Sequence, residues 1–389
     1  MLRIRLLPWE YGVRNLLRRP GRTVLTLLGL TLVVTLVFVV VGFVRGMEKS
    51  LRAAADPRVV LIHSIGGGEN LESSSLPTRS IALLLASLEG IQRRYGAGYV
   101  SPELFLATQV ATEDDPEGTL GLIRGVTRSA ALVRGQVQLI EGQWPGQGEV
   151  MVGRLAATKL GRPPEQLSVG RTLMIEGQPW RICGVFSSIG SALECEIWGP
   201  LDEFQQAMKR QDLSLVAVTL APGADFSAID EFCKERLDLE LQATPECYYY
   251  ESLHAHYRPV RMLAWTVMAL VAAAGVFAGL NTMYGNVAGR VRELAMLQTI
   301  GFTRAAIVVA LLQEGVLLAA AAALAASGMA VALIDGVAVR FTMGAFHLRV
   351  DPTGLLIGCG VGLAIGLVGA LPPAIRAMRM PIAQSLKAL

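Results

Sequence analysis

The chain of 389 residues is poor in charge: Asp, Glu, Lys and Arg make up 17% of it, against about 25% in a typical soluble protein. The shortage is uneven, because four long stretches hold almost no charge while residues 45–259 have the composition of an ordinary soluble domain. Together with 52% hydrophobic residues, this excludes disordered, collagen-like and coiled-coil proteins, and also a plain soluble enzyme. The formal net charge of +3 gives no indication of nucleic-acid binding.

Patterns of catalytic or metal-binding residues are also missing. The sequence has no Walker A motif, no Gly-x-Ser-x-Gly, no His-Glu-x-x-His and no Cys-x-x-Cys. Only four histidines are present, and His254 and His256 are spaced so that their rings would point apart on a helix. We therefore expect no catalytic residue, no cofactor and no metal site, so that the protein is not an enzyme by itself and any energy input comes from a partner.

Four stretches are long and apolar enough to cross a membrane as helices: residues 24–44, 260–284, 305–334 and 353–375. The first could instead be a secretory signal peptide, because three alanines at 53–55 resemble a cleavage site. Its apolar run is too long for a signal, however, and charged residues separate it from those alanines. Buried helices of a large soluble protein are the other alternative, and they mostly have shorter apolar runs. We interpret all four stretches as membrane spans.

Basic residues in the short flanking segments predict the orientation. Residues 1–23, 285–304 and 376–389 carry an excess of Arg and Lys, whereas the 335–352 loop balances two Arg with two Asp. The positive-inside rule places the first three segments in the cytoplasm. Residues 45–259 and the 335–352 loop then lie outside, and both termini lie inside, in a multi-pass membrane protein.

Residues 45–259 are too many for a loop, so we expect them to fold as an external domain inserted between spans one and two. Short apolar runs separated by turn residues predict strands, and three stretches predict helices, which together indicate a mixed α+β fold. Expected strands are 58–65, 121–126, 148–152, 172–175, 180–185, 195–198 and 213–220, with helices at 81–88, 201–210 and 225–237. Four of the five cysteines, which either pair or stay as buried thiols, lie in this domain: Cys183, Cys195, Cys233 and Cys247.

Two segments on the cytoplasmic side have the pattern of amphipathic helices. Residues 8–22 combine an apolar face with arginines, which predicts an interfacial helix that leads into span one. Residues 286–300 place Val287, Val291 and Leu294 on one stripe beside charged residues, and Gly301 suits the end of that helix. By itself, this second pattern fits equally an interfacial helix and a helix that docks onto a cytosolic subunit.

The spans themselves hold two notable features. Gly354, Gly358, Gly362 and Gly366 fall on every fourth residue of the fourth span, and small residues at this spacing let helices approach closely in lipid. Glu314 lies about 16 Å along the third span, at 1.5 Å per residue. A charge at this depth is costly, so we expect it to make a structural hydrogen bond to a neighbouring helix rather than to contact substrate.

Several motifs, in this order along the chain, resemble the MacB/FtsX-type permeases of ABC transporters. They are RNLLRR at 14–19 leading into RTVLT at 22–26, LIEGQWPGQGEVMVG at 139–153, PWRICGVF at 179–186, RELAMLQTIG at 292–301, and the ending 376–389 with Pro381 and Ser385. Gly289 departs from the family, which usually has an acidic residue before the arginine at 290.

The resemblance implies a transmembrane subunit of the bacterial inner membrane. It would work as a dimer, with a second copy or a paralogue, and with a cytosolic ABC ATPase supplied in trans. ATP-driven motion of the spans would move the external domain and drive export or extraction of a lipid, lipoprotein, peptide or glycolipid. The alternative is an FtsX-like subunit that activates an external cell-wall hydrolase. A periplasmic adaptor is a further candidate partner, beside membrane lipids. The ATPase-binding coupling helix would comprise Arg290, Arg292, Glu293, Leu294, Leu297 and Gly301.

Overall fold

The computed structural model describes residues 9–18, 20–67, 70–87, 90–94, 96–112, 115–341 and 344–379. The chain divides into two compact units. The helical unit comprises Met1–Arg45, Pro259–Val337 and Leu348–Leu389, and the sheet unit comprises Gly46–Arg258 and Ala338–His347. The predicted basic residues before Trp9, Arg19 and the motif residues after Arg379 lie outside the described residues.

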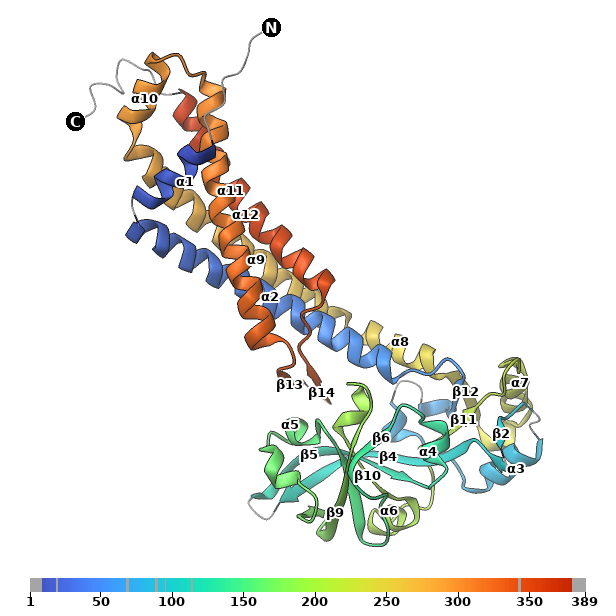
Figure 1. The fold of residues 1–389 in the computed structure, drawn as a ribbon. Helices are drawn as coiled ribbons and strands as arrows, with labels where there is room; N and C mark the ends of the chain where they lie inside the picture. The colour runs from blue at the N-terminus through green and yellow to red at the C-terminus, as the bar shows by residue number, and fades with distance from the viewer. Residues whose placement is uncertain are drawn as a thin grey trace. The chain divides into compact units, whose positions relative to one another are not determined.

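Four helices of the described chain are long and apolar enough to cross a membrane. They are α2 (Pro20–Ala54), α9 (Arg258–Ala288), α11 (Arg304–Met329) with a π-helical turn at Ala330–Ile334, and α12 (Pro352–Arg379). Each contains one of the stretches expected as spans. Two shorter helices, α1 (Trp9–Arg18) and α10 (Val291–Thr299), belong to the same unit (Figure 1).

Local sequence explains several helix ends. Gly301, with a φ of +102°, separates α10 from α11, and the Thr303 hydroxyl caps α11 by accepting the Ala306 N–H at 3.2 Å. Pro372 and Pro373 lie inside α12 and do not end it. A proline inside a membrane helix is tolerated because neighbouring helices satisfy the backbone groups that it frees.

The four glycines of α12 define which helices meet. A Cβ on Gly354 or Gly358 would contact Val41 or the Phe38 ring of α2, and one on Gly362 would contact Val34 of α2. Gly366 faces Ala319 of α11. The ladder therefore lets α12 pack closely against both α2 and α11, as small residues do in lipid.

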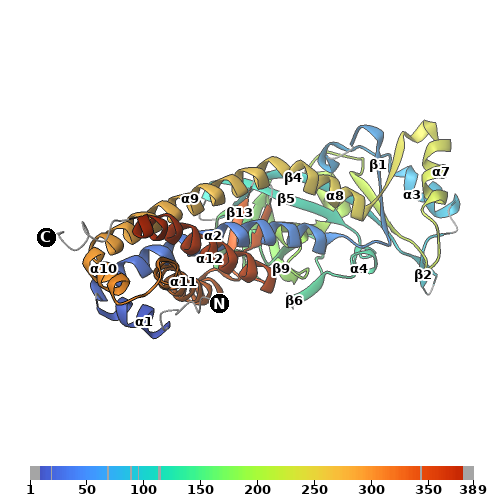
Figure 2. The ribbon, with the colours of Figure 1, turned by 90° about the horizontal axis from the view of Figure 1, so that it is seen from above.

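The sheet unit is built on a mixed sheet of ten strands. Several of these strands are labelled in Figure 2. The strand order is β12 (Leu241–Pro245), β1 (Val59–Ser64), β11 (Leu215–Thr219), β4 (Val100–Thr112), β5 (Asp115–Val126), β10 (Glu196–Pro200), β7 (Glu149–Gly153), β9 (Gln178–Ser187) and β6 (Gln138–Gly142), with β8 (Thr172–Ile175) paired to β4 and β9. Pairing is parallel between β10 and β5 and between β7 and β9, and antiparallel elsewhere. Helices α3 (Arg79–Ser87), α5 (Ala156–Leu160), α6 (Leu201–Ala207) and α7 (Ser227–Glu235) contribute to the apolar core on the sheet.

The expected external loop at 335–352 contains a hairpin of β13 (Ala338–Phe341) and β14 (Gly344–His347). This hairpin belongs to the sheet unit, although its residues follow α11 in the chain. It is held there through Cys195, whose Sγ accepts from the Ala345 N–H and donates to the Ala345 carbonyl, both at 3.0 Å. All five cysteines lie in the described chain and are free thiols.

Candidate functional site

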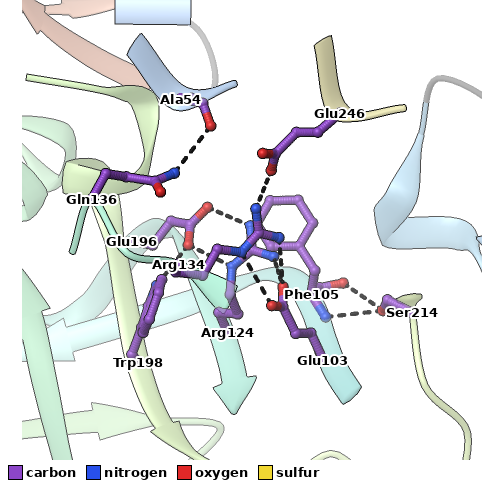
Figure 3. Close-up of polar contacts among 10 residues, drawn as sticks. All are labelled: Ala54, Glu103, Phe105, Arg124, Arg134, Gln136, Glu196, Trp198, Ser214 and Glu246. Carbon is purple, nitrogen blue, oxygen red and sulfur yellow. Dashed lines mark hydrogen bonds and ion pairs between the residues drawn. The ribbon is translucent and has the colours of Figure 1, made fainter. Parts of the chain in front are cut away.

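The sheet unit contains a buried cluster of five charged side chains, shown in Figure 3. Arg124 on β5 and Glu103 on β4 are on neighbouring strands, and Glu196 on β10 completes the row. Arg134 ends the short helix α4 (Ala130–Val133), and Glu246 begins α8 (Glu246–His256). Each of these side chains has a relative exposure of 5% or less. Charges this deep in a protein are stable only when they are paired.

The two arginines bridge the three carboxylates. Arg124 donates from Nε and Nη2 to the two oxygens of Glu196, at 2.7 and 2.6 Å, and from Nη1 to Glu103 at 2.5 Å. Arg134 donates from Nε and Nη2 to Glu103 at 3.2 and 3.1 Å, and from Nη1 to Glu246. Forked arginine–carboxylate pairs of this kind give both strength and a defined geometry.

The carboxylates of the cluster differ electrostatically. Burial acts to raise the pKa of Glu103, but the charges of Arg134 and Arg124 outweigh it and hold that pKa below its usual range. Burial raises the pKa of Glu246, and Arg134 offsets this only in part. The same carboxylates raise the pKa of the Arg134 guanidinium well above its usual value, although burial opposes this. Glu103 is therefore the firmly ionised acid at the centre.

The cluster also holds the chain where α2 ends and α8 begins. The second oxygen of Glu246 accepts the Asp56 N–H at 2.9 Å, two residues after α2. Gln136, close to Arg134 in the chain, donates from Nε2 to the Ala54 carbonyl at 3.2 Å. Through Glu246 and Arg134, the start of α8 and the residues just after α2 are thereby attached to Glu103 on β4. We call these residues (Glu103, Arg124, Arg134, Glu196 and Glu246) the buried joint.

The helical unit has a buried ion pair of its own. Arg290, between α9 and α10, donates from Nη1 and Nη2 to the carboxylate of Glu314 on α11, at 2.9 and 3.3 Å. Nη2 also reaches the Asn15 carbonyl of α1 at 3.4 Å. Arg290 is 8% exposed and Glu314 2%. Glu314 thus makes its hydrogen bonds with a neighbouring element, and Arg290 joins α1 and α11 to the connection between α9 and α10.

Helix α10 has two faces. Leu294 is buried with Val287, Ile307 and Ala374, and the half-buried Leu297 packs against the same cluster. The other face carries the exposed residues Arg292, Glu293, Met296, Thr299 and Ile300. Met296 is 45% and Ile300 76% exposed. The helix is therefore anchored on its own bundle while it presents two apolar and two charged side chains outward.

Two family models match the chain. The model of the MacB-like periplasmic core domain matches residues 23–231, more than half of the chain, and the model of the FtsX-like permease C-terminal region matches residues 265–382. The chain belongs to the MacB/FtsX-type permease family. Its members are transmembrane subunits of ABC transporters, so this protein is a permease subunit with several membrane spans and a mixed α/β core domain.

Solved structures with similarity to the permease include the periplasmic region of MacB from Actinobacillus actinomycetemcomitans. The two are 13% identical with a TM-score of 0.39, and the match covers 53% of this chain and 96% of that one. Another is the extracellular domain of the noncanonic ABC-type transporter YknZ from Gram-positive bacteria, with 16% identity, a TM-score of 0.36, and coverage of 48% and 99%. No curated protein matches this chain. The family assignment therefore depends on the two models.

The structure divides the predicted coupling residues of the permease into two groups. Arg292, Glu293 and the exposed Gly301 lie at the surface, where a partner can reach them. Arg290, Leu294 and Leu297 face the permease's own helices instead. The family resemblance implied a coupling role for all six residues, but a sequence stripe does not show that α10 packs against α11 and α12. Met296 and Ile300, which were not predicted, are the apolar residues that face outward.

The buried joint was missed entirely by sequence reasoning. Its members lie between 103 and 246 in the sequence, and separate charged residues in a soluble-like domain are usually surface residues. The one available signal was the position of Arg124, a charged residue inside the apolar run predicted as the strand 121–126. Among the described residues, no group of three or more His, Cys, Asp or Glu side chains is placed to hold a metal ion.

Proposed function

We propose that this permease couples ATP hydrolysis by a separate cytosolic ATPase to motion of its core domain outside the membrane. That motion drives export or extraction of an amphipathic substrate, in the class of a lipid, lipoprotein, peptide or glycolipid. The observation that carries the proposal is the two-faced helix α10. Its inner face joins it rigidly to α11 and α12, so force on its outer face reaches the spans.

The outer face has the composition of a docking site for a protein. Met296 and Ile300 supply apolar contacts, and Arg292 and Glu293 supply charges of both signs that would set the register of a partner. A helix that only lies on an anionic membrane needs a basic face, and Glu293 is poorly suited to that. A cytosolic ATPase is therefore the partner that we assign to this face.

The buried joint supplies the other end of the coupling. Helix α2 ends two residues before Asp56, whose N–H binds Glu246. Helix α9 begins two residues after α8, which starts at Glu246. Both helices are therefore close in the chain to residues that the Arg134–Glu246 ion pair connects. A shift of either helix along its axis would act on β4, β5 and β10 through a buried set of charge-assisted hydrogen bonds. Such a set transmits a displacement because it is costly to break.

We place both termini and α10 in the cytoplasm and the sheet unit outside, from the distribution of basic residues. Membership of the β13–β14 hairpin in the sheet unit supports this, since the segment between spans three and four then lies on the same side as residues 46–258. Impermeant thiol labelling of a cysteine at position 120 tests the orientation, and labelling only from the cytoplasmic side would reverse it.

We also propose that the permease works as a dimer with a second copy or a paralogue. In the most apolar 18-residue stretch of α9, only 6% is buried within the chain, whereas 39% of the corresponding stretch of α11 is buried. An apolar helix so little covered by its own bundle has a free face for lipid or a second permease. An FtsX-like subunit that activates a cell-wall hydrolase remains the alternative, and it would share the same docking face.

The docking proposal is tested with Ile300→Ala and Glu293→Arg in the full chain, by co-purification with the cytosolic ABC ATPase of the same cell. Truncation of an apolar contact at an interface hot spot costs above about 1 kcal/mol, so ATPase affinity should fall roughly fivefold or more. Leu17→Ala on α1 is the matched control, because Leu17 is 72% exposed and Ile300 76%. If Leu17→Ala weakens binding and the α10 variants do not, the ATPase docks on α1.

A further inference from the structure

The sheet unit has a cavity of about 250 Å³ beside the buried joint. Its lining comes from distant parts of the chain: the last turns of α2, strands β4 and β5, helix α8 and the β13–β14 hairpin. This volume is somewhat below the roughly 300 Å³ at which sites for drug-sized ligands begin. The cavity therefore suits a small molecule or one arm of a larger one.

Aromatic rings form much of the wall. Phe105, Tyr249, Tyr257, Phe341 and Phe346 all line the cavity. The Tyr257 and Phe341 rings are 5.5 Å apart between centroids, and those of Phe341 and Phe346 6.3 Å. Phe105 already carries a cation, since Arg124 Cζ lies 4.4 Å from its ring centroid. The faces of such rings attract cations by their negative potential.

Charge around the cavity is also out of balance. Among the described residues that line the cavity, the charged groups are Glu72, Glu196 and Glu246 against Arg124 and Arg134, which leaves one carboxylate in excess, not counting the exposed His256. Glu103, Glu196 and Glu246 are bound to the two arginines of the joint. The carboxylate of Glu72 makes no hydrogen bond or ion pair with the described residues, and Lys159 acts on it only through its field. Burial raises the pKa of Glu72 and outweighs the opposing field of Lys159.

Tyr249, with its phenol, is a second polar residue in the lining of this cavity. It lies in the electrostatic field of Arg124, Glu196 and Glu72, and burial raises its pKa to about 12. No hydrogen bond of its hydroxyl to another described residue is present. An apolar cavity with a few convergent polar groups that lack partners is the usual form of a ligand site.

We propose that this cavity binds a lipophilic cation, with the aromatic rings around its apolar body and Glu72 as the counter-ion of its ammonium group. Anionic ligands are disfavoured because the cavity already has an excess of negative charge. A neutral apolar ligand would leave Glu72 uncompensated. The binding itself is independent of ATPase docking; only the idea that the ligand is transported cargo rests on the proposed function.

The test measures binding of three small probes to the full chain in nanodiscs of neutral phosphatidylcholine, without ATPase or ATP, and with empty nanodiscs as blank. The probes are phenyltrimethylammonium, its uncharged parent N,N-dimethylaniline, and the anion benzenesulfonate. We expect the cation to bind tightest and the anion weakest. Equal binding of cation and neutral parent, tighter binding of the anion, or no binding of the cation would each overturn the proposal.

Variants then assign the counter-ion. Glu72→Gln should weaken binding of phenyltrimethylammonium roughly tenfold, as expected for loss of a charged partner, and should leave N,N-dimethylaniline unchanged. Glu72→Asp keeps the charge and should retain binding of the cation, which separates charge from folding. Glu165→Gln, at an exposed site of the same unit, is the matched control. If Glu72→Gln binds the cation as the unmodified chain does, Glu72 is not the counter-ion and the proposal fails. Loss of ATPase docking in the α10 variants would leave all of these results unchanged.

Discussion

Arg134→Met tests whether the buried joint holds α8 and the end of α2 to the sheet. The substitution removes three hydrogen bonds to carboxylates, two to Glu103 and one to Glu246. Glu103 keeps Arg124 as a partner, but Glu246 keeps only the Asp56 N–H. Removing one member of a buried ion pair costs about 3–5 kcal/mol, because a buried charge stays without compensation. If the free energy needed to open the backbone around Glu246 falls by about 3 kcal/mol in this variant, the equilibrium constant for that opening rises roughly a hundredfold.

Hydrogen–deuterium exchange of the full chain in nanodiscs measures this locally. We expect backbone amides at residues 54–58 and 246–252 to lose roughly a hundredfold in protection, and amides in β7 and β9 to change far less. Arg128→Met is the matched control, since Arg128 lies just before α4 and is exposed. The double variant Arg134→Met with Glu246→Met should recover part of the loss, because no buried carboxylate of Glu246 then remains. Equal exchange in Arg134→Met and Arg128→Met would refute the joint as a mechanical connection.

Two further predictions follow from packing and from charge. Gly358→Val should destabilise the helical unit by about 1–3 kcal/mol, because the new side chain would collide with the buried Phe38 ring. Gly360→Val is the control, since a Cβ there has no atom within 4 Å. Thermal unfolding in detergent compares the two variants, and equal melting temperatures would contradict the packing. The depressed pKa of Glu103 means that its stabilising effect is present above its unfolded pKa of about 4.3 and is lost as pH falls through the folded value. Unfolding curves between pH 7 and pH 3 should therefore show a smaller acid loss in Glu103→Gln than in the unmodified chain, and identical pH slopes would show that Glu103 is not the acid responsible.

Much of the chain's organisation could be predicted from local pattern. Four apolar runs with almost no charge, each long enough to cross a hydrocarbon core, identify the candidate spans without any tertiary information, because each helix satisfies its own backbone in lipid. Strands such as Thr172–Ile175 were predicted with the bounds that they have, since turn residues enclose short apolar runs there. The long strand β4 was not predicted, because polar residues such as Ser101, Glu103 and Thr108 interrupt its apolar pattern.

The faces of α10 show why site residues are harder to predict than elements. The sequence places Leu294 and Leu297 on a stripe, but an apolar stripe on a short helix is the same whether it meets a partner or its own bundle. Only the fold of α10 against α11 and α12 shows that the stripe is used internally and that Met296 and Ile300 face outward.

The sequence by itself determined that this is a membrane protein with a large folded domain between its first two apolar stretches. The length of each apolar run and the charge of its flanking residues can be read directly along the chain, without knowledge of tertiary contacts. Tertiary structure alone decided where the charged side chains find partners. Arg134 and Glu246 are 112 residues apart and Cys195 and Ala345 are 150 apart, yet each pair is in contact. Such contacts depend on strand order and on the return of the 338–347 hairpin to the sheet unit. Long-range pairing of this kind leaves no periodic trace along the chain, since its energy is gained only once the sheet has formed.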